Sequence, residues 1–150
     1  MNRYLVDSNV LLRWLDTTDE EHSTAKNAID ALDAQGHSLH IAPQNIIEFW
    51  AVASRPIDKN GFGWDVARCI SSVPLLLASF DYLPDTTAIF DEWRRLVTVY
   101  SVVGLHVHDT RLVAVMKAHG VDSLLTFNAK HFQRFEAGEN IAVVEPASVQ

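Results

Sequence analysis

Four side chains with oxygen donors stand out because of the residues around them: Asp7, Glu48, Asp109 and Asn128. Asp7 directly follows the apolar run 4–6, and Asn128 follows a second, mostly apolar run at 124–127. Glu48 stands among the large apolar residues of 46–50, where burial of a carboxylate is costly unless something positive compensates it. Asp109 precedes an apolar pattern at helical spacing. The sequence predicts one acidic site built from distant parts of the chain.

Grouped carboxylates favour one kind of chemistry. Like charges a few ångströms apart repel and raise each other's pKa, so such a cluster persists mainly where a cation binds. Oxygen donors select Mg²⁺ or Mn²⁺ over zinc. An ion of this kind can bind a phosphodiester oxygen, activate a water molecule and stabilise the leaving oxygen. The residues therefore predict metal-assisted phosphodiester hydrolysis, which needs no nucleophilic serine.

Alternating strands and helices are expected to position these side chains. The expected strands cover 4–6, 38–42, 80–83, 123–127 and 141–144, and the expected helices cover 10–15, 25–36, 46–53, 64–73, 85–100 and 109–120. This alternation is typical of βαβ units, and it predicts a three-layer α/β/α fold around a parallel sheet of about five strands. Such sheets bind ligands at the carboxyl ends of their strands, and we expect all four polar side chains there.

Each of the four residues also has a purely structural interpretation. Asp7 and Asp109 are good helix N-caps. Glu48 could be a polar residue on an exposed helix face, and Asn128 could cap a turn. The four together indicate a shared site more strongly than any one of them alone.

Composition limits the class of protein. A chain of 150 residues suits a single domain covering 1–150. The net charge of −7 argues against binding nucleic acid by bulk attraction, but it allows a carboxylate cluster that recruits cations. Cys69 is the one cysteine, so no internal disulfide can form and a reducing cytoplasm is expected. No run approaches the roughly 18 apolar residues that a membrane span needs, and Asp7 and Arg13 interrupt the first apolar stretch, so we expect no signal peptide and no membrane attachment.

The chain resembles the PIN-domain family and, within it, the VapC-type toxins of bacterial toxin–antitoxin pairs. The resemblance covers nearly the whole chain. It rests on four blocks in order: Val6-Asp7-Ser8-Asn9-Val10-Leu11-Leu12; Asn45-Ile46-Ile47-Glu48-Phe49; Asp109 with Ala114, Ala118 and Gly120; and Leu125-Thr126-Phe127-Asn128 with His131-Phe132. The order and spacing of all four blocks make the resemblance specific.

The resemblance implies a metal-dependent endoribonuclease that uses Mg²⁺ or Mn²⁺. The catalytic residues would be Asp7, Glu48 and Asp109, and the metal ligands would be these acids together with Asn128. Ser8, Asn9 and Thr126 would support them by hydrogen bonding. The implied sheet order is 3-2-1-4-5, and the implied partners are RNA, a cognate antitoxin and a second copy in a homodimer.

One position departs from the family pattern. Asn128 stands where many members of the family have Asp. An amide can still bind a metal or orient a water molecule, but it brings no charge. We therefore expect one well-held ion, and any second ion site would need the substrate to complete it.

Other interpretations remain open from the sequence. A PIN-like module that binds RNA or protein without catalysis is one, and Asn128 is its best support. An aspartyl-phosphate phosphatase is another, although Asn9 stands where such enzymes need a second acid. His106 and His108 would point to the same side of an extended segment and so allow a zinc site. Three basic residues near the acidic motifs are candidates for contacts with RNA phosphates: Arg13, Arg111 and Lys130.

Overall fold

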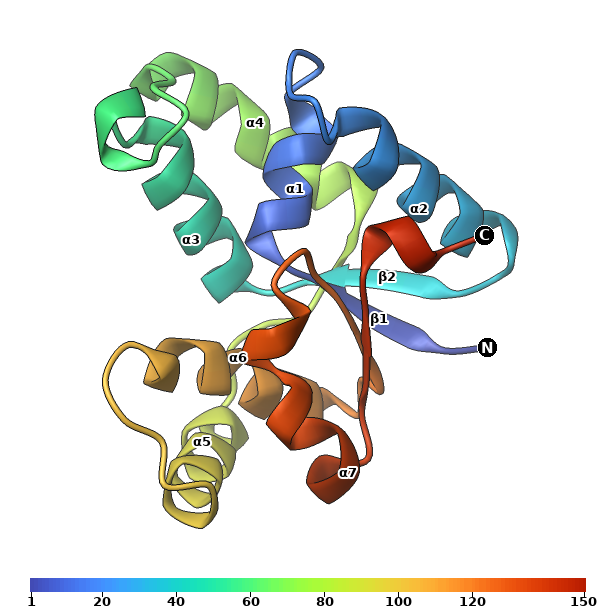
Figure 1. The fold of residues 1–150 in the computed structure, drawn as a ribbon, viewed down its shortest axis with the longest axis vertical. Helices are drawn as coiled ribbons and strands as arrows, with labels where there is room; N and C mark the ends of the chain where they lie inside the picture. Colours follow the sequence, from blue (N-terminus) through green and yellow to red (C-terminus); the bar gives the residue numbers. More distant parts are fainter.

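The protein, described over residues 1–150 by a computed structural model, is built on one parallel sheet in the order β3-β2-β1-β4-β5 (Figure 1). The strands are β1 (Arg3–Val6), β2 (Ser38–Ile41), β3 (Asp81–Tyr82), β4 (Ser123–Leu125) and β5 (Ala142–Val144). All four neighbouring pairs are parallel. The predicted fold class and strand order are confirmed.

Helices cover both faces of the sheet. They are α1 (Ser8–Leu15), α2 (His22–Ala34), α3 (Pro43–Ser54), α4 (Val66–Ser79), α5 (Thr87–Val99), α6 (His106–His119) and α7 (Glu136–Glu139). Helices α1 to α4 lie on one side of the sheet, and α5 to α7 lie on the other (Figure 1). No helix combines the length and the apolar character that crossing a membrane requires.

The central strand β1 separates two hydrophobic cores. Its side chains alternate between the faces of the sheet, as in any strand. Tyr4 and Val6 pack into the first core, under α1 to α4, while Leu5 packs into the second, under α5 and α6. Because both faces are covered, β1 is apolar throughout its buried length, which is why the short run 4–6 gave a strand signal.

The topology brings the ends of β1 and β4 together. Val6 pairs with Leu125, and the Asp7 N–H donates to the Leu125 carbonyl at 3.0 Å. The chain leaves β1 toward β2 on one side and reaches β4 on the other, so this is the switch point of the sheet. Asp7 and Thr126 are the first residues beyond the paired ends.

Helix α6 begins earlier than the sequence predicts. It starts at His106 instead of Asp109, after Gly104 takes the left-handed backbone conformation with φ of +61°. The N–H groups of Val107 and His108 then form the first turn with the carbonyls of Gly104 and Leu105. Asp109 therefore lies inside the first turns of the helix, and its interpretation as the N-cap is wrong.

Helix α3 provides a test of the first core. Phe49 is fully buried and packs edge-to-face on Trp64, with ring centroids 5.9 Å apart. Replacing Phe49 with Ala should lower the free energy of unfolding by about 3–5 kcal/mol, because it removes apolar contacts and leaves a cavity. Denaturant unfolding followed by circular dichroism measures this change.

The control lies two residues earlier on the same helix. Ile47 is 68% exposed, so Ile47→Ala should change the free energy of unfolding by no more than about 0.5 kcal/mol. Equal losses in the two variants would show that the first core is packed differently.

Candidate active site

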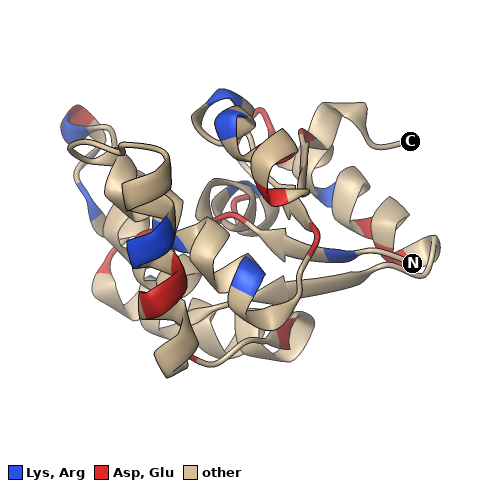
Figure 2. Ribbon diagram, turned by 90° about the horizontal axis from the view of Figure 1, so that it is seen from below, with Lys and Arg blue, Asp and Glu red and all other residues tan.

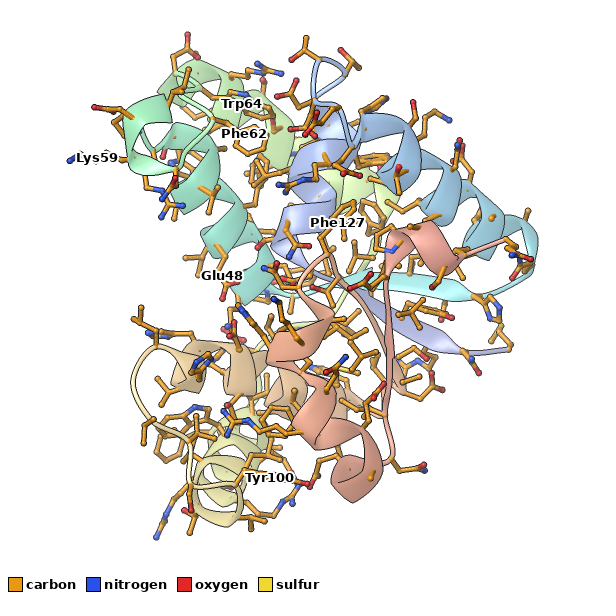
Figure 3. The ribbon with its side chains drawn as sticks, viewed as in Figure 1. Glu48, Lys59, Phe62, Trp64, Tyr100 and Phe127 are labelled. Carbon is orange, nitrogen blue, oxygen red and sulfur yellow. The ribbon has the colours of Figure 1, made fainter.

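All four predicted polar residues line one cavity of about 260 Å³: Asp7, Glu48, Asp109 and Asn128. They come from the end of β1, the second turn of α3, the first turns of α6 and the loop after β4. Glu48 lies near the start of α3, between the two groups of helices (Figure 3). Ser8 and Asn9 line the same cavity. The cavity therefore joins residues separated by more than a hundred positions of the chain.

Asp7 is buried and held by hydrogen bonds at both carboxylate oxygens. The Ser8 N–H donates to Oδ1 at 2.7 Å, and the Thr126 hydroxyl donates to Oδ2 at 2.8 Å. Burial raises the pKa of Asp7 above its ordinary value, and the negative charge of Asp109 adds to this shift. The hydrogen bonds from Thr126 and Ser8 oppose the shift. Asp7 is thus a fixed carboxylate in a site where negative charge is costly.

Asn9 and Thr126 join the two strand ends around Asp7. The Asn9 amide N–H₂ lies 3.3 Å from the Thr126 hydroxyl and 3.4 Å from Asp7 Oδ2, while its carbonyl oxygen accepts the Phe127 N–H at 3.1 Å. The Asn128 N–H donates to the Thr126 hydroxyl oxygen at 3.0 Å. These bonds account for the supporting positions of Asn9 and Thr126 next to Asp7.

Glu48 also has a raised pKa. Burial is the main cause, and together with the nearby carboxylates of Asp7 and Asp109 it raises the pKa from 4.5 to about 7. A hydrogen bond from Gln44 opposes this shift. The side chain is therefore poised to gain or lose a proton near neutral pH, and a cation in the cavity would stabilise its charged form.

Gln44 is a site residue that the sequence analysis missed. Its amide N–H₂ donates both to Glu48 Oε1 and to the His108 carbonyl, each at 2.7 Å, and its own carbonyl oxygen accepts from Arg111 at 2.9 Å. Gln44 thereby ties α3 to α6 and fixes one oxygen of Glu48. The available signal was its position one helical turn before Glu48.

Asp109 is flanked by two histidines from different segments. Its Oδ2 lies 3.6 Å from His106 Nδ1 and 3.5 Å from His131 Nδ1. The two imidazole rings meet edge-to-face with centroids 5.7 Å apart. The expected pair of His106 and His108 on an extended segment is wrong, because both lie in helix α6, where residues two apart point in different directions.

The three predicted basic residues lie in three different places relative to the acidic cavity. Arg13 lines the acidic cavity, where it donates to the Asn9 carbonyl at 2.9 Å and lies over the Phe127 ring. Arg111 lines an adjoining cavity of about 450 Å³, which Glu48 and Asp109 share. Lys130 is exposed after Asn128 and lines neither cavity. Lys and Arg are spread among acidic residues over the ribbon (Figure 2).

The donors around the cavity suit a hard divalent ion in kind and in charge. They are carboxylate and amide oxygens, and the raised pKa values of Asp7 and Glu48 show that their negative charge lacks compensation. No three Asp, Glu, His or Cys side chains lie close enough together to form a ready metal centre. The acids thus surround the cavity without meeting at one point.

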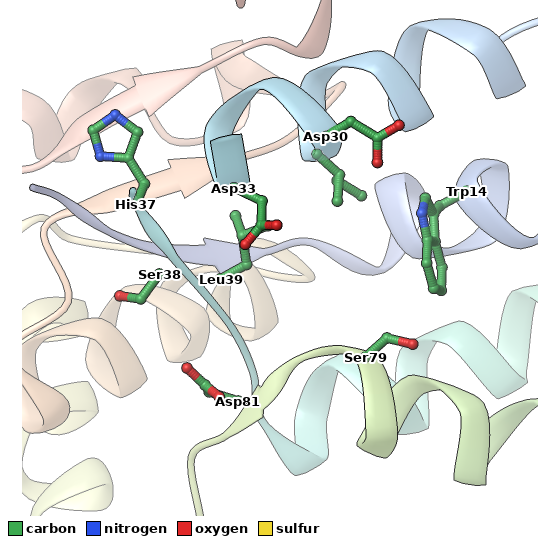
Figure 4. A pocket seen from close by; sticks show the side chains of 9 residues that line it. Trp14, Asp30, Asp33, His37, Ser38, Leu39, Ser79 and Asp81 are labelled. Atoms are coloured by element: carbon green, nitrogen blue, oxygen red, sulfur yellow. The ribbon is translucent and has the colours of Figure 1, made fainter. Parts of the chain in front are cut away.

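A separate hollow of about 410 Å³ lies between α2, α4 and the strands β2 and β3 (Figure 4). Asp30, Asp33 and Asp81 line it, together with His37 and Trp14. It contains none of the predicted site residues. We therefore place the candidate active site at the carboxyl ends of β1 and β4.

Comparison with known proteins identifies the family. The model of the PIN domain matches residues 4–138. The chain belongs to the PIN-domain family. No functionally curated protein has a matching sequence.

Several solved structures share this PIN fold. VapBC-1 from nontypeable Haemophilus influenzae is 16% identical with a TM-score of 0.67, over 97% of this chain and 99% of that chain. VapBC2 from Rickettsia felis, bound to a DNA fragment from its promoter, is 15% identical with a TM-score of 0.66, over 95% and 98%. VapC20 from Mycobacterium tuberculosis, described as a sarcin–ricin loop cleaving toxin, is 14% identical with a TM-score of 0.63, over 87% and 94%.

The pKa of Glu48 predicts a pH-dependent stability. The folded PIN domain binds this proton more tightly than the unfolded chain, so the contribution of Glu48 to folding is most favourable at low pH and is lost as the pH rises from about 4.5 to about 7. Relative to Glu48→Gln, the wild-type protein should become progressively less stable over this range and stay so above it. Denaturant unfolding at a series of pH values without metal measures the difference.

The same experiment has an internal control. Glu20 is exposed and lies outside the cavity, so Glu20→Gln should show no such pH-dependent gap. Addition of Mn²⁺ above pH 7 should stabilise the wild-type protein more than Glu48→Gln, since a bound ion favours the charged carboxylate. A constant gap at every pH would mean that Glu48 is not held in a charge-disfavouring site.

Proposed function

We propose that this PIN-domain protein is an endoribonuclease that hydrolyses RNA with Mg²⁺ or Mn²⁺. The observation that carries the proposal is the cavity at the switch point of the sheet. Asp7, Glu48 and Asp109 line it from three elements, and burial, with the charges of Asp7 and Asp109, raises the pKa of Glu48 to about 7. Such uncompensated charge is costly in a protein that binds no cation there. Among proteins of the same fold, VapC20 is described as a toxin that cleaves the sarcin–ricin loop.

The residues of the acidic cavity have two roles: most would hold the ion, and one would accept a proton. Asp7 and Asp109, with the neutral amide of Asn128, would hold the ion together with Glu48. When bound, a hard divalent ion polarises the phosphodiester and lowers the pKa of water. Ser8 and Thr126 keep Asp7 fixed for this task.

Glu48 is the residue best suited to accept a proton from the attacking water. Gln44 fixes the carboxylate through Oε1, which leaves Oε2 to accept the proton. The water oxygen then bonds to phosphorus while the bond to the leaving ribose oxygen breaks, and solvent supplies the proton for that oxygen. Arg13, which lines the cavity, would offset charge on the phosphate.

Asn128 limits the number of ions. It lines the cavity but brings no charge, so the four positions together offer three negative groups. This supports a single well-held ion before substrate binds. The phosphatase alternative loses support, because the Asn9 side chain donates to the Thr126 hydroxyl oxygen and accepts from the Phe127 N–H, and supplies no acid.

We also propose that the protein is the cytoplasmic toxin of a toxin–antitoxin pair and forms a homodimer. The same fold occurs in several VapBC proteins. A row of apolar side chains on the outer face of α4 supports a protein partner: Val66, Ile70 and Leu77 are all exposed at helical spacing. An apolar face of a partner helix would fit such a row.

The catalytic proposal predicts a loss of activity on removing one charge. Asp7→Asn and Asp109→Asn should each lower the rate of metal-dependent RNA cleavage by at least about 100-fold, since each removes a group that holds the ion. Gel assays with purified protein and either Mg²⁺ or Mn²⁺ measure the rate, and circular dichroism checks the fold. Asp91→Asn, an exposed acid on α5, is the matched control and should cleave normally.

Two results would contradict the proposal. Folded wild-type protein that cleaves no RNA with either ion would favour a binding module without catalysis. Full cleavage by either variant would remove that residue from the active centre.

The proposal of a protein partner on α4 predicts which substitution releases that partner. Ile70→Asp should release a cognate antitoxin that the wild-type protein retains, since a charge in the apolar row opposes helix docking. Co-expression and affinity purification measure the retained partner. Val99→Asp, which is exposed on α5, should leave the complex intact. Failure of the wild-type protein to retain any such partner would argue for another role of this PIN domain.

A further inference from the structure

A small aromatic pocket adjoins the acidic site. It has a volume of about 260 Å³ and lies between α5 and α6, lined by Phe90, Trp93, Val107, His108 and Arg111. Two of these residues, His108 and Arg111, also line the cavity that contains Glu48 and Asp109. The aromatic pocket therefore borders the cavity of about 450 Å³, which in turn shares Glu48 and Asp109 with the acidic cavity.

One aromatic ring of the pocket, Trp93, is held in place, and the other, Phe90, is exposed. The Trp93 indole N–H donates to the Val107 carbonyl at 2.9 Å, which holds its ring against α6. Phe90 is 61% exposed, although it is one of the largest apolar residues in the chain. The centroids of the two rings lie 5.7 Å apart and the ring planes are tilted by 31°, so the rings lie side by side as two aromatic surfaces. Nothing within the chain covers the outer ring.

Arg111 sets the polar side of the pocket. Its guanidinium donates to the Gln44 carbonyl oxygen at 2.9 Å and lies 3.3 Å from Asp85. These contacts hold a planar cation between the aromatic rings and the carboxylates. A guanidinium in this place can contact a phosphate or stack on a flat ring.

We propose that Phe90 and Trp93 form a stacking platform for one unpaired nucleobase next to the cleaved phosphate. A nucleobase has apolar faces and polar edges, which match two aromatic rings beside a guanidinium and an imidazole. In a duplex the bases are paired and stacked on one another, so only an unpaired base can enter the pocket. The proposal rests on the ribonuclease function and adds a specificity to it.

The pocket fits a base better than it fits a second protein. It is small, it adjoins the cavity of about 450 Å³ that Glu48 and Asp109 line, and polar side chains form the shared boundary: His108 and Arg111, with Asp85 beyond them. Stable protein interfaces instead need broad apolar areas. A second copy of the chain on this surface is the competing outcome, and the experiment below separates the two.

The test combines protein and RNA changes. Binding of a short single-stranded RNA is measured by fluorescence anisotropy with Asp7→Asn protein in Mg²⁺, so that the RNA is not cleaved. Adding Phe90→Ala should raise the Kd by about 5- to 150-fold, as expected for one lost base stack. The control Val99→Ala should leave the Kd unchanged, since Val99 is 64% exposed on the same helix but lies away from the pocket.

An abasic scan provides the decisive comparison. The same RNA is made with one abasic nucleotide at each position in turn. At one position the missing base should raise the Kd for protein with Phe90 but not for protein with Phe90→Ala. A Phe90→Trp variant should keep tight binding, because it retains an aromatic face. Duplex RNA of the same sequence should bind with equal Kd to both proteins.

The outcomes separate this proposal from the ribonuclease function. If wild-type protein cleaves RNA and Phe90→Ala changes neither the Kd nor the abasic scan, the platform is overturned while the nuclease stands. If wild-type protein cleaves nothing but the scan shows the coupling, the platform stands and the nuclease fails. If Phe90→Ala changes only the oligomeric state, measured by light scattering, the surface binds a second copy and the platform is overturned.

Discussion

The site depends on the hydrogen bond between the Thr126 hydroxyl and the Asp7 carboxylate. This bond joins residues that are 119 positions apart, and it exists because β1 and β4 pair in parallel with Val6 opposite Leu125. The strand order thus decides which polar side chains meet. With any other neighbour for β1, the Asp7 Oδ2 atom would lose the Thr126 hydroxyl as its hydrogen-bond donor. The acidic cavity is therefore a product of the sheet topology more than of any local motif.

The cavity also has an energetic cost that the rest of the fold must offset. Two carboxylates, Asp7 and Glu48, have raised pKa values, and burial is the main cause for both. Two fully packed cores on the two faces of the sheet supply the apolar burial that such a site requires. A protein that only had to fold would place apolar residues here. The carboxylates of Asp7 and Glu48 are thus best explained by the function of the site, because they do not help the domain to fold.

The sequence predicted the fold well because its strongest signals are local. The run 4–6 with Asp7 behind it fixes a buried strand that ends in a turn, and β1 follows that pattern. The start of α6 was missed because the helix begins in a turn that follows Gly104. The periodicity of apolar residues gives no sign of that turn. Gln44 and His131 were missed as site residues because their partners are set by tertiary contacts. The roles of Asp7, Glu48, Asp109 and Asn128 remain predictions, although the structure brings all four to one cavity.

The division of the molecule into two cores has one further consequence. Asp7 and Glu48 stand on the side of α1 and α3, whereas Asp109 stands on α6 beneath the opposite core. An ion held by all three would bridge the two halves as a removable cross-link. Since only the folded chain can offer this arrangement, the ion would add free energy to folding in proportion to the logarithm of its concentration. The strength of the link between the two halves of the domain would then depend on the concentration of divalent cations around the protein.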